Sequence, residues 1–205
     1  MAGGFASGGN YYTVAKSYSG ASAFSAAAWI YYTAAADTTV AGLWEGAGTQ
    51  LQWLLSKNSS NQSVVAIYDN NVRFVAAGSL STSAWQHIAL TFSTTDGLRS
   101  FINGSQVGTA GVSGGNLASR TASFGIGARQ AGSEQWSGQI AELATWTARL
   151  TAAQIASLAK GFAPPNVLKP DCYIPMVRNV VDLANKYTIT TVGTPTVENH
   201  PRIYK

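Results

Sequence analysis

The stretch EQWSGQIAELATWTARLTAAQIASLAKG, residues Glu134 to Gly161, decides the fold. Its first half alternates apolar and other side chains from Ile140 to Trp146, a pattern typical of a β-strand. Its second half predicts a short α-helix near residues 151–160, because Thr151 and Gln154 have the spacing of a capping box and Gly161 supplies a stop. One short helix directly after a long strand predicts a fold built mainly of strands.

Short apolar and β-branched runs recur on both sides of this stretch. Two Gly-containing dipeptides, Asp96-Gly97 and Asn103-Gly104, separate three of these runs and predict a three-stranded meander with tight hairpin turns. The predicted strands are residues 11–15, 24–32, 40–44, 51–57, 64–68, 72–76, 85–92, 98–103, 106–110, 123–128, 140–146 and 188–192. This spacing predicts an all-β sandwich of two sheets.

Length and composition limit the domain organisation and the kinds of partner. A chain of 205 residues fits one all-β domain, 1–205, in which residues 164–205 form a C-terminal extension that returns to the sandwich. Charged residues make up 11%, and the 13 basic residues behind the net charge of +4 are scattered, which argues against a nucleic-acid surface. The apolar stretch from Ala21 to Ala36 is too short to cross a bilayer, so we expect no membrane insertion.

Cysteine, histidine and the first residues of the chain exclude other classes. The single Cys172 and two histidines, His87 and His200, predict neither a disulfide framework nor a zinc site. The opening MAGGFASGGNYY lacks a charged region followed by an apolar one, so we expect no secretory signal.

Five spaced segments carry a resemblance to a known family. They are FSAAAWIYY, WQHIALTF, FINGSQVGT, FGIGA and WSGQIAELATW with TAAQIASLA, and together they span roughly residues 10 to 160. Their order resembles the laminin-G-like branch of the concanavalin A-like lectin and glucanase superfamily. The resemblance implies an antiparallel jelly roll of two sheets with the short helix packed at one edge.

The C-terminal region carries a second resemblance. The segment DCYIPM, the following VVDLANKYTITTVGTPTV and the pair His200-Pro201 resemble the ends of small stand-alone proteins encoded by tailed bacteriophages and prophages. This resemblance implies a non-enzymatic virion structural protein, either a capsid decoration or accessory protein or a small tail or fibre component. Such a protein would be made in the host cytoplasm, would adhere to capsid or tail shell proteins, and would form a homo-oligomer.

The alternative hypothesis is a lectin-like module that binds a bacterial surface glycan, which needs an exposed aromatic platform with polar partners. The candidate residues are Trp44, Trp53, Trp136 and Arg129, and further conceivable elements are Glu45 and the pair Tyr68-Asp69. Trp29, Trp85 and Trp146 match core positions of the family, since most tryptophans bury a large area. The two hypotheses stay open at this stage.

Catalysis and metal binding receive less support from the sequence. No two of the nine acidic residues lie within five positions of each other, so the closely spaced carboxylates of the family's glucanases are missing and we expect no enzyme. We interpret His87 and Glu142 as hydrogen-bonded structural residues of the sheets. No cofactor is expected, but calcium is possible because many laminin-G-like domains bind it, and Asp37, Asp69 and Asp96 lie in predicted turns.

Overall fold

Two antiparallel sheets packed face to face form the body of the protein in a computed structural model. The structure describes residues 2–5, 9–34, 36–44, 50–111, 114–129, 132–176, 180–198 and 203. Glu45 and the pair His200-Pro201, which the sequence singled out, lie outside these residues.

The strands of the two sheets are assigned within these described ranges. The eight-stranded sheet runs in the order β10 (Ser105–Ala110), β9 (Gly97–Ile102), β8 (Gln86–Ser93), β3 (Ala23–Tyr32), β12 (Gly138–Trp146), β1 (Ala2–Phe5) and β15 (Thr196–Glu198), and β13 (Cys172–Ile174) also pairs with β12. The seven-stranded sheet runs in the order β14 (Ile189–Val192), β2 (Tyr11–Val14), β11 (Phe124–Ile126), β4 (Thr38–Trp44), β5 (Leu51–Lys57), β6 (Ser63–Tyr68) and β7 (Val72–Ala77). The predicted all-β jelly roll is confirmed.

The predicted meander and helix ends are present in detail. β9 and β10 are joined by Asn103 and Gly104, with φ of 48° and 86°, which matches a two-residue turn with left-handed backbone at both positions. Helix α1 (Ala152–Ala159) begins with a capping box, in which the Thr151 side chain accepts a hydrogen bond from the Gln154 amide at 3.2 Å. Gly161 follows the end of this helix as the stop residue, with a φ of 90° that is costly for residues with a Cβ atom.

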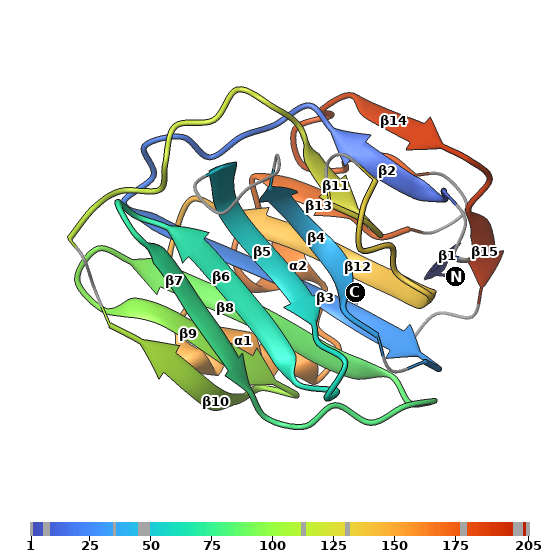
Figure 1. Cartoon of the computed structure of the whole chain (residues 1–205), viewed down its shortest axis with the longest axis horizontal. Coiled ribbons are helices and arrows are strands. Elements are labelled where there is room, and N and C mark those ends of the chain that lie inside the picture. Colours follow the sequence, from blue (N-terminus) through green and yellow to red (C-terminus); the bar gives the residue numbers. More distant parts are fainter. Residues whose placement is uncertain are drawn as a thin grey trace.

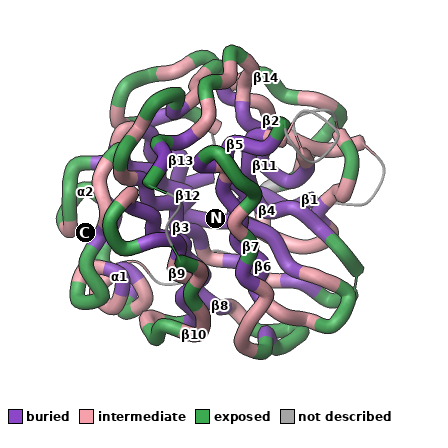
Figure 2. Tube along the Cα trace, turned by 60° about the vertical axis from the view of Figure 1, so that its left-hand side comes forward, coloured by how far each residue is buried: buried purple, intermediate pink, exposed green. Residues whose placement is uncertain are grey.

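The main core lies between the sheets, and a smaller one lies outside the eight-stranded sheet. Trp53, Phe24 and Phe124 meet in the main core, with ring centroids 5.1 Å and 5.3 Å from Trp53. On the far side, α1 and a second short helix, α2 (Pro164–Val167), cover β12 and β8. Figures 1 and 2 show both helices on the side of the eight-stranded sheet that faces away from β4–β7. The outer face of the seven-stranded sheet therefore has no helix over it in the described chain.

A bulge in β12 marks the place where this strand changes partners. Its first residues pair with β1, its last residues pair with β13, and its register against β3 shifts between Ala141 and Ala144. Glu142 lies in this bulge with a φ of 53°, in the left-handed region. Separately, no described helix is long and apolar enough to cross a membrane.

Candidate functional site

Four residues that pair across strands β4 to β7 form a row on the outer face of the seven-stranded sheet. The register places Gly42 of β4 opposite Leu54, Leu54 opposite Ala66, and Ala66 opposite Phe74 of β7. A Cβ atom on Gly42 would lie 2.7 Å from the Trp53 carbonyl oxygen, so a side chain there would push against the neighbouring backbone. Phe74 stands at the end of the row with 57% of its surface exposed.

Leu54 and Phe74 of this row, together with other residues of the sheet and of neighbouring loops, line a cleft of about 210 Å³, which we call the outer cleft. Its apolar lining is Trp44, Leu54, Val64 and Phe74. Its polar lining is Asp37, Ser56, Lys57, Asn58, Arg129 and Glu134. Aromatic rings beside charged and amide side chains are a common composition for binding sites, where a few polar groups fix the orientation of the ligand.

The Trp44 ring is covered on one side by the guanidinium group of Arg129. The two groups are 3.7 Å apart, measured from the guanidinium carbon to the ring centroid, which is a cation–π contact. Arg129 is held there by an ion pair with Glu134. The Glu134 backbone is anchored in turn, because its carbonyl oxygen accepts a hydrogen bond from the Thr39 amide at 2.8 Å.

Lys57 and Asp37 lie at another part of the same cleft. The Lys57 ammonium group donates to the Ala36 carbonyl oxygen at 2.6 Å and lies 4.6 Å from the Tyr32 ring centroid. Burial lowers the pKa of Lys57, and the nearby Asp37 carboxylate partly opposes that shift. Asp37 itself is exposed, and one of its oxygens accepts a hydrogen bond from the Ser59 amide at 2.7 Å.

Three residues that the sequence singled out separately therefore meet in the outer cleft: Trp44, Arg129 and Asp37. Trp53 and Trp136 do not, and their prediction as exposed platform residues is wrong. Both are fully buried, since Trp53 packs in the core between the sheets and Trp136 packs against Tyr32, with ring centroids 6.0 Å apart. The run LQWLLSK hides this because β5 is buried on both faces and shows no alternation.

Two tryptophans expected in the core are only half-buried. Trp29 lies on the outer face of the eight-stranded sheet, where its ring meets that of His87 at a centroid distance of 5.5 Å. Trp85 packs beside Tyr31, with ring centroids 5.9 Å apart. Trp146 is buried as expected, beneath helix α1.

The structure does not bring the three aspartates considered for calcium, Asp37, Asp69 and Asp96, together into one metal site. Asp69 is fully buried and paired with Arg73 at 3.2 Å, and Asp96 is paired with Arg99 at 3.5 Å and with Arg149 at 3.0 Å. Among the described residues, no three side chains of His, Cys, Asp or Glu come together in a way that could hold a metal ion. A hard cation such as calcium needs six to eight oxygen ligands, and arginine side chains already engage the carboxylates of Asp69 and Asp96.

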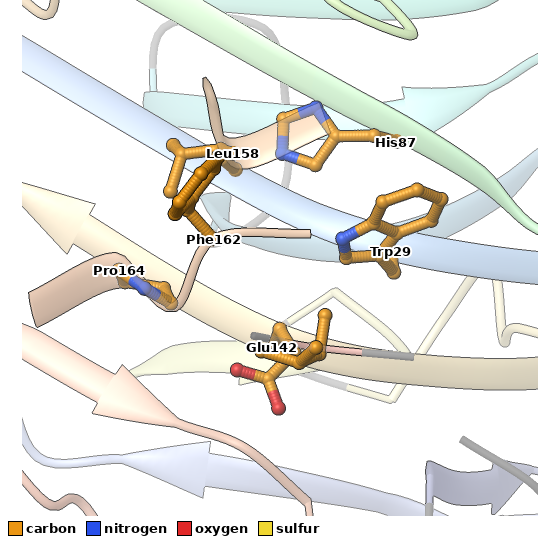
Figure 3. A pocket seen from close by; sticks show the side chains of 8 residues that line it. Trp29, His87, Glu142, Leu158, Phe162 and Pro164 are labelled. Atoms are coloured by element: carbon orange, nitrogen blue, oxygen red, sulfur yellow. The ribbon is translucent and has the colours of Figure 1, made fainter. Parts of the chain in front are cut away.

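A second, much smaller space lies between the eight-stranded sheet and the helices (Figure 3). Its volume is about 10 Å³, which is room for roughly one water molecule. Trp29 and His87 line it, and burial lowers the pKa of His87 to about 3. The Glu142 carboxylate points away from the His87 ring and accepts a hydrogen bond from the Tyr173 hydroxyl at 2.5 Å. Glu142 is thus a hydrogen-bonded residue of the sheet, and its donor is the Tyr173 hydroxyl. The space itself is too small for a saccharide.

The family assignment agrees with this architecture. Residues 6–156 match the family described as the concanavalin A-like lectin/glucanases superfamily. The chain belongs to this superfamily. A search of curated proteins found no significant match.

Solved structures with the same fold include several binding proteins. A protein from Bacteroides ovatus to which carbohydrate binding is ascribed superposes with a TM-score of 0.69 at 20% identity, covering 95% of this chain. This chain spans 60% of the length of that protein. The sialidase module CBM40 from Ruminococcus gnavus, solved with α2,3-sialyllactose, has a TM-score of 0.65 at 12% identity, covering 78% of this chain and 97% of the module.

A heptameric pentraxin from Limulus polyphemus is similar over most of both chains. Its TM-score is 0.66 at 16% identity, and the match covers 93% of this chain and 89% of the pentraxin. At such identities, these three structures establish the shared fold, and function has to be argued from the site.

Proposed function

We propose that this protein is a non-enzymatic carbohydrate-binding module and that its ligand binds in the outer cleft. The observation that carries the proposal is that Trp44 and Phe74 line one cleft together with the Arg129–Glu134 ion pair and Asp37. Sugar rings have apolar faces that stack on aromatic side chains, and they have hydroxyl groups that bond to carboxylates and amides. The cleft offers both kinds of contact within one small volume.

Exposure of the aromatic side chains supports the same assignment. Phe74 leaves 57% of its surface in solvent although β7 supplies other side chains to the core, such as Val75. Its neighbours across the sheet, Leu54 and Ala66, pack into a separate apolar cluster with Trp44 and Tyr68 at its border. Phe74 is thus an exposed aromatic side chain standing on a rigid sheet, and rigid aromatic side chains are favoured anchors of binding sites.

The test is glycan binding by the wild-type protein and by the Phe74→Ala variant. A glycan array identifies a bound oligosaccharide, and isothermal titration then measures its dissociation constant. We expect Phe74→Ala to weaken binding at least tenfold, a loss of about 1.4 kcal/mol. Trp44→Ala should weaken binding as well and should also release Arg129.

Val72→Ala is the matched control for Phe74→Ala. Val72 lies two residues away on the same strand, is 47% exposed, and does not line the cleft. Its replacement removes exposed apolar surface from the same strand, so binding should stay unchanged. If wild-type protein bound no glycan, or if Phe74→Ala and Val72→Ala behaved alike, the proposal would be wrong.

The virion role and location stay predictions that rest on the C-terminal resemblance. Glycan binding and a place in a phage particle are compatible, because the glycan could belong to the bacterial host. Mass spectrometry of purified particles from the source of this sequence tests the virion role, and light scattering after gel filtration tests the predicted homo-oligomer. Absence of the protein from such particles would remove the virion role and leave the glycan-binding proposal intact.

A further inference from the structure

We infer that the outer cleft selects a neutral saccharide over an acidic one. The inference rests on the proposed function and specifies the chemical class of its ligand. It runs against the whole-chain charge, because a net charge of +4 would by itself favour anionic partners. The charges inside the cleft lead to the opposite expectation.

Both cations of the cleft are already engaged by the protein. Arg129 is ion-paired with Glu134 and stacked on Trp44, so a ligand carboxylate would have to compete with a carboxylate that is built in. Lys57 is almost fully buried, its ammonium group is bonded to the Ala36 carbonyl oxygen, and the nearby Asp37 carboxylate supplies its countercharge. Neither side chain offers an uncompensated positive charge to an incoming anion.

The two anions of the cleft, Asp37 and Glu134, balance these two cations but keep free acceptor positions. Asp37 is exposed, and its hydrogen-bond partner is the neutral Ser59 amide. An ionised carboxylate has about four acceptor positions, so Asp37 and Glu134 keep capacity to accept further hydrogen bonds. A ligand has to donate hydrogen to use that capacity. The hydroxyl groups of a neutral saccharide donate, whereas a carboxylate or sulfate group accepts and brings a negative charge for which the cleft has no unpaired cation.

Two further polar groups of the cleft are also committed internally. The Ser56 hydroxyl donates to the Thr38 carbonyl oxygen at 2.9 Å, and the Asn58 amide donates to the Gln62 side chain at 2.9 Å. Ordinary ionic strength screens charges beyond about 8 Å, so these local groups outweigh the distant lysines and arginines. Complementarity therefore favours a ligand rich in hydroxyl donors and free of charge.

The experiment compares one oligosaccharide in two forms. The neutral form is one identified on the array, or one obtained by reducing the carboxyl groups of a bound acidic glycan to primary alcohols. The acidic form carries carboxylates in place of those primary alcohols. Titration of wild-type protein should show at least tenfold tighter binding of the neutral form.

Glu134→Gln tests the built-in carboxylate. The amide keeps the shape of the side chain and leaves Arg129 with an uncompensated charge, so binding of the acidic form should increase at least tenfold relative to wild type. Asp96→Asn is the matched control, because Asp96 is an exposed, arginine-paired carboxylate that does not line the cleft. That variant should keep the wild-type preference.

The outcomes separate this inference from the proposed function. Equal or tighter binding of the acidic form by wild-type protein would overturn the inference while leaving glycan binding in place. No binding of either form would overturn both. The wild-type comparison decides the matter even if Glu134→Gln folds poorly, which circular dichroism would reveal.

Discussion

Individual tryptophans in this chain have sharply different surroundings. Trp53 is fully buried between the sheets among Phe24, Phe124 and Tyr18. We expect Trp53→Ala to lower the free energy of unfolding by about 3–5 kcal/mol, because it leaves a large cavity. Urea unfolding followed by circular dichroism measures this change. Trp44 is half-buried at the cleft, so a loss of equal size in Trp44→Ala would contradict the structure.

His87 should make stability depend on pH. Burial lowers its pKa from 6.5 to about 3 in the folded protein, so the unfolded chain binds the proton more readily between these values. Stability should therefore fall as pH drops below about 6.5, by up to about 1.4 kcal/mol per pH unit. Urea unfolding at pH 7 and pH 5 tests this. His87→Gln should lose less stability over that range, and equal losses would show that His87 is not the cause.

At this scale the sequence identifies part of the candidate site. Trp44 and Arg129 were predicted as glycan-binding residues, and Asp37 was predicted as a calcium ligand; all three line the cleft. Phe74 was not predicted. It lies on the edge strand β7, most of whose residues are at least partly exposed, so the sequence pattern does not show which face of the strand is turned to solvent. Glu134, which pairs with Arg129, lies in a loop, and its own backbone is left-handed with a φ of 48°. No residue pattern indicates this conformation.

Among the elements, helix α1 depends on its capping box. Thr151→Ala removes the hydroxyl that accepts a hydrogen bond from the Gln154 amide, so we expect the free energy of unfolding to fall by about 1 kcal/mol. For a chain of this size that corresponds to a melting temperature lower by about 2–4 °C, measurable by scanning calorimetry. Ser157 lies in the same helix, and its hydroxyl donates to the Ala153 carbonyl oxygen. Its replacement by alanine should lower stability only slightly. A larger loss from Ser157→Ala than from Thr151→Ala would contradict this account.

The strands that the sequence predicted are those with local signals. Alternation, β-branched residues and Gly-containing turns placed β8, β9 and β10 within one or two residues. The short strands β1, β13 and β15 and the helix α2 were missed. β1 reads AGGF, which has little strand propensity, and it forms because β12 and β15 pair with it on both sides. Tertiary pairing, which is invisible in a single sequence, made the difference.

At the scale of the whole molecule, Asp182 attaches the C-terminal region to the sandwich. Its buried carboxylate accepts hydrogen bonds from the backbone amides of Tyr173, Ala184, Asn185 and Tyr187, at 2.8 to 3.1 Å. Asp182→Asn replaces one acceptor oxygen with a donor. We expect the amides of residues 184–187 to exchange hydrogen at least tenfold faster, as mass spectrometry or NMR would show. Asp96→Asn should leave their exchange unchanged, and protection retained in Asp182→Asn would contradict this role.

The position of β1 between β12 and β15 also governs the order in which the chain can fold. Residues 2–5 leave the ribosome long before their partners, residues 138–140 and 196–198. β1 must therefore wait until these partners have been synthesised before it can pair, and pairings between residues so far apart are formed slowly. During that interval β1 has neither of its partner strands, and both of its edges are unpaired. Production of this protein should accordingly be most prone to aggregation during translation, and a lower expression rate, which lowers the concentration of incomplete chains, should reduce contacts of that strand with other chains.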